Sequence, residues 1–332
     1  MSAIIEVRDL SKRFRQHKRF PGVAGAFRTL VTSEYSEIVA VDNISFDIQA
    51  GEALGYLGPN GAGKSTMIKM LTGILSPSGG ILSVLGRAPH QHRTLNAREI
   101  GVVFGQRSQL WWDLPVIESL LLNQKIYRVA DSRFRSNLAY FTDLLELGSF
   151  LDRPVRQLSL GQRMRCELTM ALLHDPKILF LDEPTIGLDV VAKDVVRSFL
   201  ARINRERGVT IILTTHDLVD IEQICPRLLM VDDGKLLYDG PLTKLRANLG
   251  GSRKLRLEFV SAPGDITLSG AELVSDEGLF KYFRIEKKAV SLISILAEIP
   301  DTAGLRDVLI EEPSIEEVIR SFYLSKPVAQ AQ

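Results

Sequence analysis

The pattern of apolar and polar positions predicts two kinds of strand. Residues 4–14 and 44–48 alternate apolar with polar side chains, as strands with one exposed face do. Residues 100–104, 177–181 and 210–214 instead form short runs of apolar or β-branched side chains. Such runs are typical of strands that are buried on both faces of a parallel sheet.

Helical patterns lie between these strands. Residues 116–130 and 190–206 have apolar side chains at helical spacing, and the region up to about residue 151 is rich in helical patterns. Two further strands are expected at residues 52–57 and 79–86. Strands that alternate with helices predict an α/β core, here with a helical insert.

A second, smaller α/β domain is predicted after Gly250 and Gly251. Alternation resumes there, and the segments expected as strands are residues 254–260, 282–286 and 308–311. Helices are expected at residues 289–298 and 314–323. We therefore expect one domain at residues 1–248 and another at residues 252–325.

The segment between the first two strands contains an expected insertion, at about residues 15–38. A basic run from Lys12 to Arg19 precedes residues 20–35, in which apolar side chains recur at helical spacing. Two interpretations of this stretch remain open. It is either an amphipathic helix at a bilayer surface or against a membrane-embedded partner, or an ordinary helix packed on the protein.

Composition narrows the class of protein. The chain has 332 residues, of which 45% are apolar, as in a globular protein of about two domains. Lys and Arg number 41 against 40 Asp and Glu, so the net charge of +1 gives no overall basic field for nucleic acid. The sequence has no membrane-spanning apolar run and no secretory signal, which predicts a cytosolic chain. Cys166 and Cys225 have no partners at metal-ligand spacing and are expected to be inert thiols.

A glycine-rich loop is the clearest chemical motif. Residues 58–66 read Gly-Pro-Asn-Gly-Ala-Gly-Lys-Ser-Thr, between a predicted strand and a helix that continues through Met67. The glycines let backbone N–H groups point inward at phosphate oxygens, and the positive end of the following helix reinforces the attraction. Lys64 is placed to reach the β- and γ-phosphates, and Ser65 to ligate Mg²⁺. The motif therefore predicts a bound nucleotide.

Acidic and polar side chains follow other predicted strands. Asp182 and Glu183 lie at the carboxyl end of a buried strand, where ligands of open α/β sheets bind. Asp182 is expected in the Mg²⁺ shell, and Glu183 as the general base that polarises or orients the attacking water. His216 follows another strand and is a second candidate for contact with the γ-phosphate. Gln106 follows a third strand, and its amide is able to contact both Mg²⁺ and water.

These motifs together resemble those of the ATP-binding subunits of ATP-binding cassette (ABC) transporters, over about residues 3–245. Gly58 to Thr66 resembles the Walker A loop, and residues 158–162, Leu-Ser-Leu-Gly-Gln, the signature motif. The Walker B strand, Q-loop glutamine, D-loop and switch histidine correspond to residues 178–183, Gln106, residues 187–189 and His216. The resemblance implies a P-loop NTPase fold of the ABC type, with a mixed-sheet core and a helical subdomain at about residues 107–176.

In this family two subunits meet head to tail, so each ATP lies between one Walker A loop and the other subunit's signature. The resemblance implies an ATPase with two shared MgATP sites. The residues implied in catalysis are Glu183, His216, Gln106 and Lys64, and those implied around the metal are Ser65, Gln106 and Asp182. The residues implied to bind the nucleotide are Gly58, Pro59, Asn60, Gly61, Ala62, Gly63, Lys64, Ser65, Thr66, Tyr35, Ser159, Gly161, Gln162 and Asp189.

Two positions depart from the family pattern. Leu160 stands where the signature motif usually has glycine, and we expect its side chain to affect ATP affinity or the approach of the two subunits. The aromatic side chain that stacks on adenine has two candidates. Tyr35 lies five residues before Ala40, the family's usual spacing, whereas Phe14 ends the first predicted strand. Tyr35 is slightly favoured.

Within the family, residues 103–115, 157–165 and 182–189 most resemble ATPases paired with ABC-2-type membrane proteins, the exporters of drugs, viologens and lipid-linked polysaccharides. This implies ABC-2-type transmembrane permease subunits and a second ATPase subunit, identical or paralogous, as partners. No nucleic acid is expected. The implied location is peripheral, on the cytoplasmic face of the inner (plasma) membrane. Trp111 and Trp112 lie in the region that borders the permease groove, where docking and core packing are both open interpretations.

The alternative function is that of a soluble ABC-type ATPase acting on nucleic acid or ribosomes. Such proteins typically have two cassettes in one chain or a long coiled coil between motifs. This chain has one cassette and no sustained heptads. The sequence therefore favours an ATP-hydrolysing transporter subunit, with export preferred over import.

Overall fold

The structure, a computed structural model, describes residues 3–17, 35–105, 107–249, 252–286, 292–299 and 304–324. The chain divides into two compact units, Met1–Gly240 and Pro241–Gln332. The division lies before helix α9 (Leu242–Leu249), which the sequence assigned to the first domain. Helix α9 contacts α11 (Ile315–Leu324), and this packing places it in the C-terminal unit.

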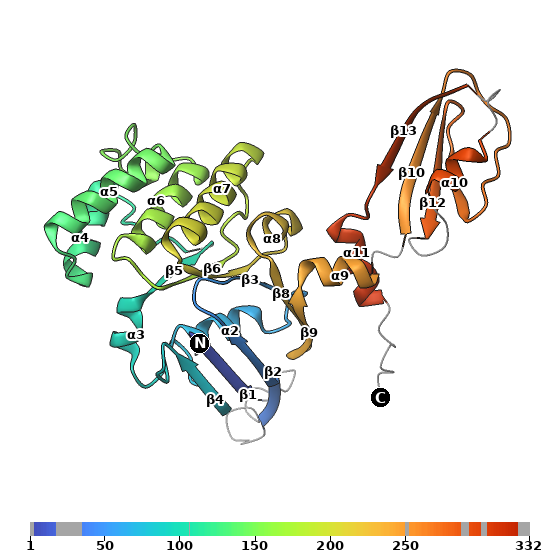
Figure 1. Cartoon of the computed structure of the whole chain (residues 1–332). Helices are drawn as coiled ribbons and strands as arrows, with labels where there is room; N and C mark the ends of the chain where they lie inside the picture. Colours follow the sequence, from blue (N-terminus) through green and yellow to red (C-terminus); the bar gives the residue numbers. More distant parts are fainter. Residues whose placement is uncertain are drawn as a thin grey trace, which may run out of the picture. The chain divides into compact units, whose positions relative to one another are not determined.

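An antiparallel sheet in the N-terminal unit contains β2 (Tyr35–Ile48), β1 (Ile5–His17) and β4 (Gly79–Val84), in that order (Figure 1). Strands β1 and β2 pair from Ile5 opposite Ile48 to His17 opposite Tyr35. Both strands are longer than predicted, so residues 15–17 and 35–38, expected in the insertion, belong to the sheet. The rest of the insertion, residues 18–34, lies outside the described residues together with its expected helix.

A second sheet of six strands has the order β5-β6-β7-β3-β8-β9. Its strands are β3 (Ala53–Leu57), β5 (Ile100–Phe104), β6 (Ile178–Asp182), β7 (Thr210–Thr214), β8 (Arg227–Asp232) and β9 (Lys235–Pro241). Strands β5, β6, β7, β3 and β8 pair in parallel. Every residue of β3 and β7 is buried, which explains their uninterrupted apolar runs. Strands β8 and β9 were not predicted from the sequence.

Helix α2 (Lys64–Leu71) lies between the two sheets (Figure 1). Its side chains Met67, Ile68, Met70 and Leu71 join one buried cluster with side chains of both sheets. Figure 1 shows the expected helical region on the other side of the parallel sheet. This region contains α4 (Val116–Tyr127), α5 (Asp131–Leu145) and α6 (Leu160–Leu172), and the separately predicted helix α7 (Val190–Arg207) lies on the same side. Two short helices, α3 (Arg93–Glu99) and α8 (Leu218–Ile224), and a 3-10 turn (Val155–Gln157) complete the described helices of this unit.

The C-terminal unit contains a four-stranded antiparallel sheet in the order β11-β12-β10-β13. Its elements are β10 (Ser252–Phe259), β11 (Ala271–Asp276), β12 (Phe280–Glu286), α10 (Leu292–Ala297) and β13 (Leu305–Glu311), followed by α11. The sheet buries one apolar cluster that includes Phe259, Phe283 and Ile295. Strand β11 was not predicted, because it is an edge strand whose side chains are mostly exposed and lack a clear alternation.

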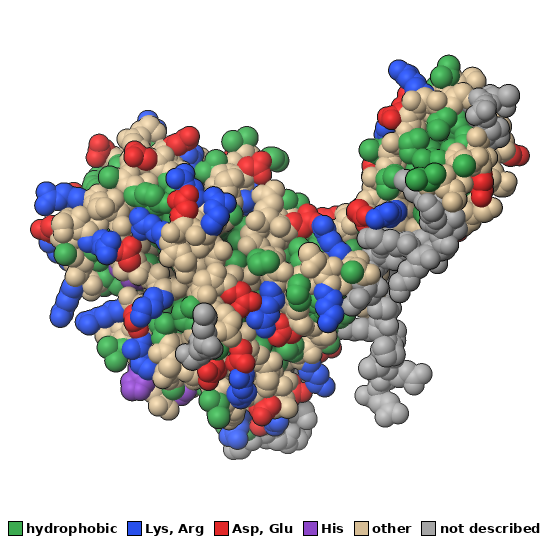
Figure 2. Space-filling model, viewed as in Figure 1, with side chains coloured by type: hydrophobic (Ala, Val, Ile, Leu, Met, Phe, Trp, Pro, Cys, Tyr) green, Lys and Arg blue, Asp and Glu red, His purple; other side chains and the backbone are tan. Residues whose placement is uncertain are grey.

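The face of the molecule drawn in Figure 2 has no dominant charge. Figure 2 shows Lys and Arg interspersed with Asp and Glu over the visible face, in agreement with the net charge of +1. Over the described part of the chain, none of the helices combines the length and the apolar character that crossing a bilayer requires.

Arg227, at the start of β8, joins the two sheets of the N-terminal unit. Its Nη1 donates to the Asp47 carbonyl of β2 at 2.9 Å and to Glu52 Oε1 at 3.0 Å. Its Nε and Nη2 donate to the two carboxylate oxygens of Asp239, at 2.7 and 2.8 Å. The hydrogen bonds to Asp239 and the contact with Glu52 raise the pKa of Arg227. Partial burial acts in the opposite direction and lowers it, but has the smaller effect. One guanidinium thus satisfies acceptors from three segments at once.

We expect Arg227→Lys to lower the free energy of unfolding by about 1–3 kcal/mol, because an ammonium group cannot pair bidentately with Asp239 and still reach Glu52. Urea titration followed by circular dichroism measures the change. Arg202→Lys is the matched control, since Arg202 pairs with the exposed Glu206 and little change is expected. Equal losses in the two variants would contradict the proposed role of Arg227.

Candidate functional site

The site forms where four parallel strands end in register. Phe104 of β5 lies opposite Asp182 of β6, Asp182 lies opposite Thr214 of β7, and Thr214 lies opposite Tyr56 of β3. The segments that follow these strands therefore leave the sheet at one edge. This edge brings together the phosphate loop, the acidic pair and the segment that contains His216, as ligand sites of open α/β sheets require.

The phosphate loop is folded closely against its surroundings. Gly61 and Gly63 have φ angles of 88° and 91°, which side chains disfavour. A Cβ atom at Gly63 would lie 2.1 Å from the carbonyl oxygen of Ala40, and one at Gly58 would lie 2.5 Å from that of Val231. The loop thus needs glycine at both positions, and β2 and β8 hold it from two sides. Helix α2 begins at Lys64, directly after Gly63.

Lys64 reaches back over this loop. Its Nζ donates to the carbonyl oxygens of Gly58 at 2.7 Å and of Pro59 at 3.1 Å. Partial burial lowers the pKa of Lys64, while the charges of Glu183 and Asp182 oppose this shift. The ammonium group is thus already placed over the concave backbone where phosphate oxygens are expected. The loop fits a nucleotide phosphate.

Asp182 joins the phosphate loop to the parallel sheet. The Ser65 hydroxyl donates to Asp182 Oδ2 at 3.2 Å, and the Thr214 hydroxyl donates to Asp182 Oδ1 at 2.5 Å. A hydroxyl beside a carboxylate is an all-oxygen set, which Mg²⁺ prefers. Within the described ranges, no group of three or more His, Cys, Asp or Glu side chains is arranged to hold a metal ion. Ser65 and Asp182 therefore fit a Mg²⁺ ion that takes its other ligands from phosphate and water.

Glu183 and His216 form a close pair. Nδ1 of His216 lies 2.6 Å from Oε2 of Glu183. This oxygen is buried and accepts no hydrogen bond of regular geometry from the described residues. A carboxylate held beside an imidazole is suited to take a proton from water. Of the two side chains, His216 is the more exposed, at 66% against 21% for Glu183.

The backbone at Glu183 is strained and firmly held. Its φ of 57° lies in the left-handed region, which few non-glycine residues occupy. The Glu183 N–H donates to the Thr214 carbonyl at 2.9 Å, and the Gly105 N–H donates to the Asp182 carbonyl at 2.7 Å. A Cβ atom at Gly105 would lie 2.1 Å from the carbonyl oxygen of Glu183. Position 105 therefore has to be glycine for the two strand ends to approach.

The signature residues lie at the start of α6. The Ser159 hydroxyl accepts a hydrogen bond from the Gln162 N–H at 3.2 Å, and the Ser159 N–H donates to Gln162 Oε1 at 3.0 Å. This reciprocal pair is a capping box, so both side chains stabilise the first turn of the helix. Asp189 likewise caps α7, where its Oδ1 accepts from the Ala192 N–H at 2.8 Å.

The beginnings of α6 and α7 are in contact. Gly187 has a φ of 73°, and a Cβ atom there would lie 3.0 Å from Leu160 Cδ2. A Cβ atom at Gly161 would lie 2.8 Å from that of Ala192. Leu160, the departure from the usual signature, thus packs its side chain toward the segment that precedes Asp189.

Both candidates for adenine stacking lie on the hairpin of β1 and β2. Phe14 is paired with Ile38, and Tyr35 is paired with His17. Ala40 marks the point where β2 passes the phosphate loop, because its carbonyl oxygen faces Gly63. Ile38, the partner of Phe14, lies closer to Ala40 along β2 than Tyr35 does. Phe14 is therefore at the strand position nearer to the loop.

The structure brings Lys64, Ser65, Asp182, Glu183 and His216 to one edge of the sheet. Ser159, Gly161, Gln162 and Asp189 lie together at the starts of α6 and α7. Gln106 lies outside the described residues.

Two residues of the site, Thr214 and Gly105, were not predicted from the sequence. In the sequence pattern Thr214 is one more β-branched strand residue, and its place as the last residue of a buried strand is the signal that marks it. Gly105 directly precedes Gln106, and its packing against Glu183 leaves no signal in the local sequence.

Comparisons with known proteins agree with this geometry. Residues 41–186 match the family described as ABC transporter. The Nod factor export ATP-binding protein I of Neorhizobium galegae is 34% identical over 298 residues, which are 87% of this chain and 82% of that protein. The ABC transporter ATP-binding protein NatA of Bacillus subtilis is 29% identical over 242 residues, 73% of this chain and 91% of that protein.

Solved structures show the same fold. The dimeric structure of MJ0796, a bacterial ABC transporter cassette, superimposes with a TM-score of 0.59 and 25% identity, over 71% of this chain and 98% of that chain. The predicted P-loop fold of the ABC type is confirmed, as is the predicted ATP-binding and ATP-hydrolysing activity. The relatives give no support to the alternative of a soluble ATPase acting on nucleic acid or ribosomes. The chain belongs to the ATP-binding subunits of ABC transporters.

Proposed function

We propose that this chain hydrolyses MgATP as the energy-supplying subunit of an exporter, at the cytoplasmic face of the inner membrane. The convergence of Lys64, Ser65 and Asp182 with the Glu183 and His216 pair at one sheet edge carries this proposal. A relative that aligns with most of the chain is named a Nod factor export ATP-binding protein, and this name supports export over import. ABC-2-type permease subunits are the proposed partners.

The residues of the sheet edge have separate tasks. Lys64 exchanges its two loop carbonyls for phosphate oxygens. Ser65 and Asp182 would hold Mg²⁺, which neutralises charge on the phosphates when it is bound. Glu183 takes the proton of the attacking water, and His216 holds that carboxylate and contacts the γ-phosphate. Gln106 is proposed to contact Mg²⁺ and water.

A second subunit completes each site in this proposal. The N-terminus of α6 presents the Gly161 N–H and the positive end of a 13-residue helix. We assign Ser159, Gly161 and Gln162, with Asp189 nearby, to the γ-phosphate of an ATP molecule that is held by the other subunit. Two such sites then form in a head-to-tail dimer.

The proposed docking surface for the permease contains Trp111, Trp112 and Leu114. Trp111 and Trp112 are 55% and 51% exposed, so neither side chain belongs to the core. The guanidinium of Arg163 lies 5.1 Å from the centre of the Trp112 ring, and Arg163 is in the first turn of α6. The surface is thus in contact with the helix that carries the signature residues.

The first test is Glu183→Gln, which keeps the shape of the side chain and removes the base. We expect ATP hydrolysis by the purified chain to fall by about 100-fold or more, because general base catalysis contributes about that much. ATP affinity should stay within about threefold, since Lys64 and the loop are unchanged. Light scattering should show a dimer of this variant in MgATP but not of Lys64→Ala. Normal turnover by Glu183→Gln would show that Glu183 is not the base.

A second test separates the two aromatic candidates. We expect Phe14→Ala to weaken ATP binding about tenfold, because loss of one stacked ring costs about 1–3 kcal/mol. Tyr35→Ala should change the affinity less than about twofold, since its strand position is farther from the loop. Isothermal titration with ATP and with a triphosphate that lacks adenine measures the difference. A larger effect of Tyr35→Ala would restore the assignment that the sequence favoured.

A third test identifies the partner. Tagged Glu183→Gln is purified from mildly solubilised native membranes in MgATP, and the accompanying proteins are identified by mass spectrometry. We expect one or two polytopic membrane proteins in near-stoichiometric amount. We also expect these membrane proteins to be absent when the double variant Glu183→Gln, Trp112→Glu is purified in the same way, because a charge at position 112 opposes burial of this surface. Recovery of ribosomes or DNA-associated proteins with no membrane protein would contradict the transporter proposal.

A further inference from the structure

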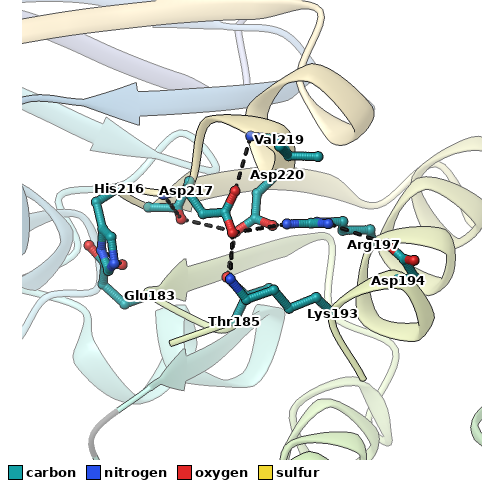
Figure 3. Close-up of polar contacts among 10 residues, drawn as sticks. Glu183, Thr185, Lys193, Asp194, Arg197, His216, Asp217, Val219 and Asp220 are labelled. Atoms are coloured by element: carbon teal, nitrogen blue, oxygen red, sulfur yellow. Dashed lines mark hydrogen bonds and ion pairs between the residues drawn. The ribbon is translucent and has the colours of Figure 1, made fainter. Parts of the chain in front are cut away.

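Asp220, in the first turn of α8, is a fully buried carboxylate with three side-chain donors (Figure 3). Its Oδ2 accepts from the hydroxyls of Thr185 at 2.5 Å and Thr215 at 2.9 Å. Its Oδ1 accepts from Arg197 Nε at 2.6 Å. The carboxylate charge is therefore paired and hydrogen-bonded, as burial requires.

The three donors come from three segments of the chain. Thr185 follows Glu183 by two residues, and Thr215 directly precedes His216. Arg197 belongs to α7 and is only 6% exposed. Asp220 therefore binds the segments that contain Glu183 and His216, and through Arg197 it ties both of them to α7.

A second carboxylate extends this link. Asp217, which directly follows His216, accepts through Oδ2 from Lys193 Nζ at 2.6 Å and from Arg197 Nη2 at 3.0 Å. Its Oδ1 accepts from the Val219 N–H at 3.1 Å and so caps α8. Partial burial acts to raise the pKa of Asp217, but Lys193 and Arg197 outweigh it and lower the pKa. Arg197 thus holds one carboxylate directly after His216 and another three residues farther along.

Stability alone is a weak explanation for such an arrangement. Buried ion pairs often contribute little, because removing the charges from water costs about as much as their attraction returns. Their geometry is strict, however, since a guanidinium and a three-donor carboxylate fit together in few orientations. Glu183 needs such support, because its left-handed backbone persists only where surrounding contacts hold it.

We propose that Arg197 and Asp220 are positioning residues, which hold Glu183 against His216 and tie this pair to α7. Helix α7 begins directly after Asp189, which caps it and has been assigned to the dimer interface. A shift of this helix as the subunits close therefore moves the pair. Hydrolysis is in this way linked to the position of α7. The inference rests on the proposed ATP hydrolysis at Glu183.

Asp220→Asn is the direct test, because it keeps the side-chain shape. An amide cannot accept from Arg197 and from both threonines at once, since one of its ends is a donor. We expect kcat to fall at least about tenfold, while KM and ATP affinity stay within about threefold. A purely structural role would lower the amount of active protein and leave kcat per ATP-binding site unchanged. Titration of binding sites with a non-hydrolysable ATP analogue provides that normalisation.

Thr215 offers a second, milder pair of variants. Thr215→Val keeps the volume and removes the hydroxyl, which also accepts from the Asp217 N–H at 3.0 Å. Thr215→Ser retains the hydroxyl. We expect kcat to fall about three- to tenfold in Thr215→Val and to recover in Thr215→Ser, with KM nearly constant in both. This pair tests the proposal even where Asp220→Asn does not fold.

Arg202→Gln is the matched control on α7, because its guanidinium pairs with Glu206, which is exposed and is not part of the network. Its kcat should equal that of the unaltered chain. Unaltered kcat in both Asp220→Asn and Thr215→Val would overturn the positioning role. Absence of hydrolysis in the unaltered chain would instead contradict the proposed function, so the two failures are distinguishable.

Discussion

The in-register ending of the parallel strands is the constraint on which the site depends. Strand β7 lies between β3 and β6, so the phosphate loop and the acidic pair are not on neighbouring strands. They meet because Tyr56, Thr214 and Asp182 form one row across the sheet. Thr214 fills the gap with its hydroxyl on one carboxylate oxygen of Asp182, and Ser65 binds the other. A displacement of β7 by one residue would reverse the faces of its side chains and separate these groups.

Close backbone contacts keep this edge rigid. Gly63 lies against Ala40, and Gly105 lies against Glu183, at distances that exclude any side chain. Glu183 itself has a strained backbone, so its carboxylate points where unstrained geometry would not place it. Such strain is stable only in a surrounding that is itself well packed, and the fully buried β3 and β7 provide it. The burial of β3 and β7 thus stabilises the strained backbone that positions the Glu183 carboxylate.

The sequence predicted most parts of the fold that have a strong local signal, although the buried apolar run of β8 was missed. The buried strands β3, β5, β6 and β7 were evident as apolar runs, and the glycine loop and Asp182-Glu183 pair as motifs. Strand β11 escaped because edge strands need not alternate. The Asp220 network was also invisible, since its carboxylate, threonines and arginine are common residue types whose relation exists only after α7 and α8 have packed. Side-chain partners across distant segments are a property of tertiary structure and leave no spacing rule in the chain.

The contact between Leu160 and Gly187 limits which residues position 187 can accept in this chain. Any side chain at position 187 would press on Leu160 Cδ2, and loss of Leu160 would leave space beside Gly187. The two positions are thus mutually dependent, although they lie on opposite sides of strand β6 in the sequence. Position 187 also has a φ of 73°, however, which side chains disfavour, so glycine is needed there for its backbone as well as for this contact. Replacing Leu160 by a smaller residue would therefore relieve only one of two constraints on position 187.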